Sequence, residues 1–174
     1  MGSSRKSTPV IFDVLAGAAA GALGTYLMTY GQKAVSKAQS EEAQKLEKEG
    51  SFELSATALV AKRLAEPLGI GLEGEKAERA GLFVHYGFGA AQGALFGLLA
   101  RKWRMPAVLR GVLFGSALWL VVDEVMVPAL KLGPSFTRLP LSSHVKALAA
   151  HLVYGSSADV GWRTLHRAAS VTIH

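Results

Sequence analysis

The sequence predicts an all-α membrane protein: a single domain, residues 1–174, built as a polytopic bundle of about four transmembrane helices. Half of the residues are hydrophobic and 18% are charged, whereas soluble domains usually carry about 25% charged residues. The charges are also clustered. Val14–Tyr30 holds none and Ala107–Val122 holds one, while Ser36–Arg79 and Arg101–Arg104 are crowded with them. This alternation favours apolar spans separated by hydrated loops.

Each span needs about 20 mainly apolar residues to cross roughly 30 Å of hydrocarbon. The third candidate is interrupted late by Asp123, Glu124 and Pro128, which predicts a distorted helix end because proline removes a backbone donor. The fourth is the least apolar, since His151 and Asp159 dilute it. The four predicted spans are residues 9–35, 80–100, 107–130 and 143–165.

The start of the chain has two interpretations. Arg5 and Lys6 followed by Ala/Gly-rich sequence are also typical of a signal peptide. Because the apolar stretch reaches Tyr30 and continues into a helical polar segment without an obvious stop, we expect an uncleaved first span.

Residues 36–79 contain no apolar run long enough to cross a membrane and predict a helical insertion. Lys37–Glu49 is rich in helix formers with opposite charges three and four residues apart. We expect it to extend the first helix into water and to end at Gly50. A short amphipathic helix from about Leu54 to Arg63 should end at Pro67 and Gly69. This insertion could lie on the membrane surface or over the mouth of the bundle, but a solvated hairpin is favoured.

The flanking charges predict the orientation. With four spans, the N-terminus, the loop between spans two and three, and the C-terminus share one side. Acids nearly cancel bases in the insertion on the opposite side. Both termini are therefore predicted to be cytoplasmic and the insertion extracytoplasmic. The basic residues on the first side are Arg5, Lys6, Arg101, Lys102, Arg104, Arg110, Arg163 and Arg167.

Glycines recur at four-residue spacing in the spans, which predicts close helix packing. Lipid tails are as apolar as leucine, so membrane helices associate through small residues and interhelical polar contacts. When the rows are extended by further four-residue steps, they reach ionisable residues. The predicted packing glycines are Gly17, Gly21, Gly89, Gly93, Gly97, Gly111, Gly115 and Gly155.

The ionisable residues inside the spans fall at two depths. Charges in a bilayer are costly and usually face the bundle interior. An inner level contains Asp13 and Asp159, and Asp159 can pair with Arg163 one turn later. An outer level, roughly 7–12 Å below the surface by helix rise, forms a predicted polar cluster. Its members are His85, Asp123, Glu124, His144 and His151.

This cluster has three possible roles. Two imidazoles and one or two carboxylates, from His85, Asp123, Glu124 and His151, could bind a divalent metal such as zinc. Histidine also titrates near neutral pH, so the cluster could pass protons. The plainest alternative is that each His–carboxylate pair fastens two helices. No cofactor is otherwise predicted.

Several function classes lack support in the sequence. The absence of cysteine excludes disulfides, cysteine-ligated zinc and thiol catalysis. The net charge of +6 fits membrane topology better than nucleic acid, because no nucleic-acid motif is present. Ser156 and Ser157 lack a neighbouring base for nucleophilic catalysis. We therefore expect a non-enzymatic protein.

Three segments carry a family resemblance: HYGFGAAQGALFGLLA (85–100), FGSALWLVVDEVMVPAL (114–130) and LPLSSHVKALAAHLVYG (139–155). Together they resemble the YagU family of bacterial inner-membrane proteins, whose biochemical role is unassigned. The resemblance covers residues 80–167 and implies a multi-pass protein of the bacterial plasma membrane. It implies no activity or cofactor.

The leading hypothesis is an inner-membrane protein whose outer polar cluster supports a proton-, ion- or stress-linked role. Four short helices barely enclose a pathway, so we expect a homo-oligomer in the lipid bilayer. Crosslinking that finds only monomer in native membranes would count against it. The alternatives are an accessory subunit that packs against a larger membrane complex through its glycine faces, and a metal-binding membrane protein or metal-dependent enzyme. An outward-facing Gly89/Gly93/Gly97 row would favour the accessory subunit.

Overall fold

Long helices make up most of the computed structural model, which describes residues 9–172; Arg5 and Lys6 lie outside this range. No strand occurs within the described residues. The long helices are α1 (Val10–Ala38), α4 (Gly74–Ala100), α5 (Ala107–Leu118) and α7 (Leu141–Thr172). The shorter elements are α2 (Glu41–Gly50), α3 (Ala56–Ala65), η1 (Glu66–Leu68), η2 (Trp119–Met126), α6 (Val127–Ala129) and η3 (Phe136–Arg138).

Three helical segments are long and apolar enough to cross a membrane: Val10–Ala38, Gly74–Ala100 and Val108–Ala129. The prediction of an all-α membrane bundle is therefore confirmed. The segment predicted as the fourth span lies within α7, which is longer than expected but too polar to qualify by composition. The number of crossings stays a prediction.

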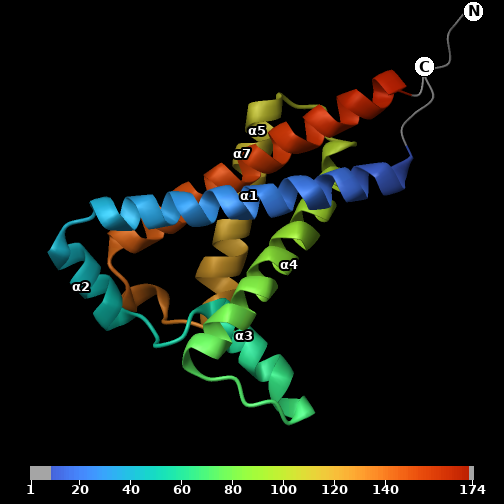
Figure 1. The fold of residues 1–174 in the computed structure, drawn as a ribbon. Helices are drawn as coiled ribbons and strands as arrows, with labels where there is room; N and C mark the ends of the chain where they lie inside the picture. Colours follow the sequence, from blue (N-terminus) through green and yellow to red (C-terminus); the bar gives the residue numbers. More distant parts are fainter. Residues whose placement is uncertain (1–8, 173–174) are drawn as a thin grey trace, which may run out of the picture.

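The helices pack in pairs that run in opposite directions (Figure 1). α1 lies between α4 and α7, α7 also packs against α5, and α3 packs against α4. α1 begins and α7 ends at one end of the molecule, which we call the terminal end. The opposite end carries α2, α3 and the loop of residues 130–140, and we call it the insertion end.

The predicted extension of the first helix into the insertion is wrong. α1 ends at Ala38, and Gln39 and Ser40 have extended backbone. The Ser40 side chain accepts a hydrogen bond from the Ala43 N–H, 3.3 Å away, and so starts a new helix, α2. The helix was predicted to continue to Gly50, but this capping serine interrupts it.

The second half of the insertion forms as predicted. α3 leads into the turn of η1, and Gly69 ends it with a φ of 71°, a conformation that favours glycine. Gly81 of α4 lies directly under α3, because a Cβ there would meet the backbone of Ala58 at 2.7 Å. α4 therefore begins at Gly74 rather than at residue 80, and its first turns support α3.

The predicted distortion near Asp123 takes the form of a wider helix. α5 continues into a π-helix, η2, that ends just before Pro128. Proline has no N–H to donate to the carbonyl four residues earlier, and a wider turn such as the Val127 N–H to Val122 O bond accommodates this loss. The π-helix presents Asp123 and Glu124 to the interior of the insertion end.

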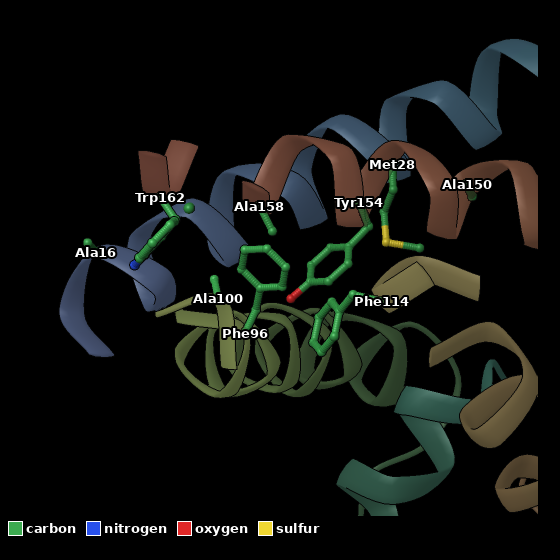
Figure 2. Packing of buried hydrophobic residues seen from close by; sticks show 10 residues of the cluster. Ala16, Met28, Phe96, Ala100, Phe114, Ala150, Tyr154, Ala158 and Trp162 are labelled. Carbon is green, nitrogen blue, oxygen red and sulfur yellow. The ribbon is translucent and has the colours of Figure 1, made fainter. Parts of the chain in front are cut away.

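The core is built from large aromatic rings facing small residues. Phe96 of α4 is fully buried, and its ring centroid lies 5.0 Å from that of Phe114. Figure 2 shows these rings beside Tyr154 of α7, whose hydroxyl points toward α4. That hydroxyl donates a 2.6 Å hydrogen bond to the Gly89 carbonyl. α1 contributes mainly alanines and glycines here, which let its backbone approach its neighbours.

The eight packing glycines all lie at helix–helix contacts within the chain. A Cβ on Gly93 would clash with the backbone of Gly17 and Gly21, and a Cβ on Gly155 with that of Gly111 and Gly115. Gly89 faces Thr25, and Gly97 faces Asp13 of α1. The Gly89/Gly93/Gly97 row therefore faces inward.

Candidate functional site

A cavity of about 390 Å³ lies between α1, α4, η2 and α7, and the first turn of α3 lines it at the insertion end. We call it the central cavity. It contains three of the predicted cluster residues, one from each of α4, η2 and α7. Its polar lining consists of Thr25, Gln32, Ser55, Thr57, His85, Gln92, Asp123, His151 and Tyr154.

His151 and Asp123 form a loose pair in this cavity. The His151 Nδ1 lies 3.5 Å from the Asp123 carboxylate and 3.0 Å from the Ala147 carbonyl. A carbonyl only accepts, so Nδ1 carries a hydrogen and donates it. Among the described residues, the other ring nitrogen, Nε2, has no hydrogen-bond partner.

His85 is held from the opposite side of the cavity. The Thr29 hydroxyl donates its single hydrogen to the Thr25 carbonyl at 2.7 Å. It therefore accepts from the His85 Nε2, which lies 3.2 Å away. The Nδ1 of His85 is left without a hydrogen-bond partner in residues 9–172. The bond joins α1 to α4, so Thr29 is a site residue that the sequence analysis missed.

Glu124 and His144 belong to a second site. The His144 Nδ1 lies 2.7 Å from Glu124, and its Nε2 lies 3.1 Å from the Phe136 carbonyl. The pair holds an imidazolium with a carboxylate, or a neutral imidazole with a carboxylic acid, and is neutral in both forms. The Phe136 ring packs on the imidazole with centroids 4.4 Å apart.

This second site lines a cavity of about 220 Å³, which we call the loop-side cavity. It lies between η2, the first turns of α7 and the loop of residues 130–140. The predicted outer cluster thus forms two neighbouring groups rather than one. Its lining is Ala56, Asp123, Glu124, Val127, Pro134, Phe136, Leu139, Ser143, His144 and Ala147.

The four residues predicted as possible metal ligands are divided between the two cavities. Within residues 9–172, no three His, Asp or Glu side chains are grouped so that they could hold a metal ion. His85, Asp123 and His151 share a cavity, but Glu124 is engaged by His144. The set fits a proton or a hydrogen-bonding ligand better than a divalent metal.

The inner level consists of fully paired carboxylates at the terminal end. Asp13 is completely buried and lies 2.6 Å from the Arg101 guanidinium and 2.8 Å from the His166 imidazole. These contacts join α1, the end of α4 and α7. Both partners of Asp13 were missed by the sequence analysis, since neither lies at a helical spacing from it.

Asp159 has a similar environment. The Arg110 guanidinium of α5 lies 2.8 Å from its carboxylate, and the Arg163 Nε lies 2.9 Å away, as predicted from the i,i+4 spacing. The Arg163 Nε is not aligned for a hydrogen bond. From the sequence, Arg110 was counted only among the basic residues of the side predicted to be cytoplasmic. As the only charged residue of Ala107–Val122, it could have indicated a buried acidic partner.

A further ion pair joins α7 to the insertion. The Lys146 ammonium lies 2.7 Å from Glu47 of α2 and 3.2 Å from the Ser36 hydroxyl of α1. It ties α2 against the bundle even though α2 buries none of its own residues. No periodic pattern along the chain indicates this long-range contact.

Residues 65–160, more than half of the chain, match the family model of a protein family of unknown function, DUF1440. The chain belongs to this family. The DUF1440 segment contains His85, Asp123 and His151, together with the Glu124–His144 pair, but not α1 with Thr29. No curated protein and no solved structure matches the chain.

Proposed function

We propose that this membrane protein has an ion-linked role and that its central cavity binds a small cation that donates hydrogen bonds, of the ammonium type. The cavity is rich in acceptors. His85 and His151 each keep one nitrogen without a partner in the described chain, and that nitrogen accepts in the neutral ring. Asp123 adds a carboxylate.

The observation that carries the proposal is the contrast between the two ends of the bundle. Asp13 has Arg101 and His166, and Asp159 has Arg110 and Arg163, as partners at 2.6–2.9 Å. Within residues 9–172, Asp123 has one ionisable partner at 3.5 Å, and a third of its side chain is exposed. Ionisable groups inside a membrane protein are costly unless they are paired or functional. A bound cation would supply the partner that Asp123 lacks.

The proposed setting is the bacterial plasma membrane, with α7 as a fourth crossing and both ends of the chain in the cytoplasm. The YagU resemblance supports the compartment. The course of α7 alongside α1, in the opposite direction, supports the fourth crossing. Its charged side chains pair with α1, α2, α5 and η2, which lowers the cost of placing a polar helix in lipid.

Thermal unfolding of the purified protein in detergent tests the proposal. We expect methylammonium chloride to raise the Tm above that in sodium chloride of equal ionic strength, because a ligand that binds the folded state stabilises it. At a hundred times Kd the gain is about 2.7 kcal/mol. Tetramethylammonium has no N–H to donate and should give no such increase.

The variant that tests the site is Asp123→Asn, which removes the charge but keeps the shape. The methylammonium shift should disappear in it and persist in Glu75→Gln, an exposed acid on α4 that does not line the cavity. An equal shift in Asp123→Asn and the unmodified chain would show that the cavity is not the binding site.

The accessory-subunit alternative loses its specific support. It rested on glycine faces available to a partner, but Gly93 and Gly97 are covered by α1, and Gly111 and Gly115 by α7. A partner would need a different surface.

A further inference from the structure

The central cavity and the loop-side cavity share a wall. Ala56, Asp123 and Val127 line both of them, from α3, η2 and α6 respectively. The cavities are therefore neighbouring compartments at the insertion end of the bundle.

The loop-side cavity has a lining that suits a cation. Its charged residues are the carboxylates of Asp123 and Glu124 and the His144 ring. His144 and Glu124 form a neutral pair, so the remaining charge is that of Asp123. Ser143 also lines this cavity, and its buried hydroxyl has no hydrogen-bond partner in residues 9–172. A water or solute in the cavity would satisfy it.

The contact between Asp123 and His151 is weak enough for the Asp123 side chain to face either cavity. Its contact with His151 is 3.5 Å long, beyond a normal hydrogen bond, whereas Glu124 is held at 2.7 Å. The His151 Nδ1 hydrogen goes to the Ala147 carbonyl, which belongs to a residue lining the loop-side cavity. A change of the Asp123 rotamer would thus move its charge between the two cavities without breaking a strong bond.

We propose that the loop-side cavity is the vestibule through which a small cation enters the central cavity, and that Asp123 is the positioning residue at the passage. This inference rests on the proposed cation site. The acidic boundary attracts a cation from the insertion end, and the same carboxylate then partners it inside. An anion would be repelled by the negative charge of Asp123 at the shared wall and would pass more slowly than a cation.

The absence of cysteine makes a direct test possible, since any introduced thiol is unique. Ala147→Cys reports on the loop-side cavity. Met28→Cys reports on the central cavity, because Met28 lines it and is only 5% exposed. Ala158→Cys, at a fully buried core position that lines neither cavity, is the matched control. Each is treated in lipid nanodiscs with aminoethyl or sulfonatoethyl methanethiosulfonate, which are similar in size and opposite in charge.

We expect Ala147→Cys and Met28→Cys to react with both reagents, roughly tenfold faster with the cationic one. Asp123→Asn should remove this preference, and Ala158→Cys should not react. In the Met28→Cys chain, Ala147→Trp should block the reaction by filling the loop-side cavity. Ala147→Leu, a milder change, should slow it if the tryptophan variant does not fold.

Two results would overturn the vestibule. One is an unchanged rate at Met28→Cys in the folded Ala147→Trp or Ala147→Leu chain, which would mean that the central cavity is reached by another route. The other is equal rates for the two reagents. In either case the methylammonium effect on Tm would persist if the cation site itself is correct, so the two proposals fail separately.

Discussion

Asp13, Asp123 and Asp159 show two outcomes for a carboxylate inside a helical membrane bundle. Asp13 and Asp159 are almost fully buried; Asp13 is paired with Arg101 and His166, and Asp159 with Arg110 and Arg163. Such pairs recover their desolvation cost through short charge-assisted contacts. Asp123 has no comparable partner, which places it at the candidate site. At this scale, the number of partners separates the two paired charges from the one that we propose to bind a cation.

Asp159→Asn should destabilise the protein by about 3 kcal/mol, the usual cost of breaking a buried ion pair by removing one partner. Arg110 would remain in the core with its side chain 10% exposed and its main counter-charge removed. The free energy of unfolding can be measured by titration with denaturing detergent in mixed micelles.

The matched control for this prediction is Glu75→Gln, which breaks an exposed pair with Arg79 on α4. Exposed pairs contribute little, so no measurable change is expected. A similar loss in both variants would mean that the Asp159 pair is not specially important.

At the scale of elements, glycine decides how closely the helices approach. α1 and α4 meet at Gly17, Gly21 and Gly93 with backbone against backbone. This proximity brings the Thr29 hydroxyl within reach of His85 further along the same interface. The glycine rows and the central cavity are therefore parts of one interface. The π-helix η2 then supplies the third wall with Asp123.

Gly93→Ala should destabilise the bundle by about 2 kcal/mol, because its Cβ would overlap the backbone of α1 and force the helices apart. Because the central cavity lies at the same interface, the increase in Tm caused by methylammonium should also be smaller in this variant. Gly87→Ala, on the same helix, is the control. No atom lies within 4 Å of its added Cβ, and alanine favours helix, so its Tm should stay equal or rise slightly. Equal losses from both changes would contradict the interface.

At the scale of the whole molecule, α7 organises the bundle. It packs against α1 and α5, and its ionisable side chains reach α2 and η2 as well as both of these helices. It is also the helix whose composition does not identify it as a span. Its residues His144, Lys146, Asp159 and His166 pair with side chains of other helices, which lowers the cost of a polar helix in lipid.

If α7 crosses the membrane, positions at its end and in the turn after α4 lie on the same side. Single cysteines at Lys102 and Arg167 should then react with an impermeant thiol reagent from one side of sealed vesicles. Lys45→Cys on α2 should react from the other side, since its side chain is 76% exposed at the insertion end. Arg167→Cys reacting from the same side as Lys45→Cys would show that α7 does not cross.

The sequence by itself determined the membrane class, the positions of the long helices and the insertion between them. Apolar length and charge clustering are local properties, so they can be read without knowing which helices touch. Local chemistry also predicted that the helical segment of α3 and η1 ends at Gly69, and that the helix is irregular before Pro128. It failed at Ser40, where one capping side chain outweighed a continuous run of helix formers.

The tertiary structure alone decided which ionisable residues meet. Helical spacing places a side chain on a face, but pairing between helices depends on their rotation and depth, and these are set by contacts distant in sequence. His85 was predicted to join four other residues, yet its hydrogen bond goes to Thr29, 56 positions away. The neighbouring residues Glu124 and Asp123 contact different histidines: Glu124 contacts His144, and Asp123 contacts His151. The π-helix and the close approach of α7 separate the two carboxylates.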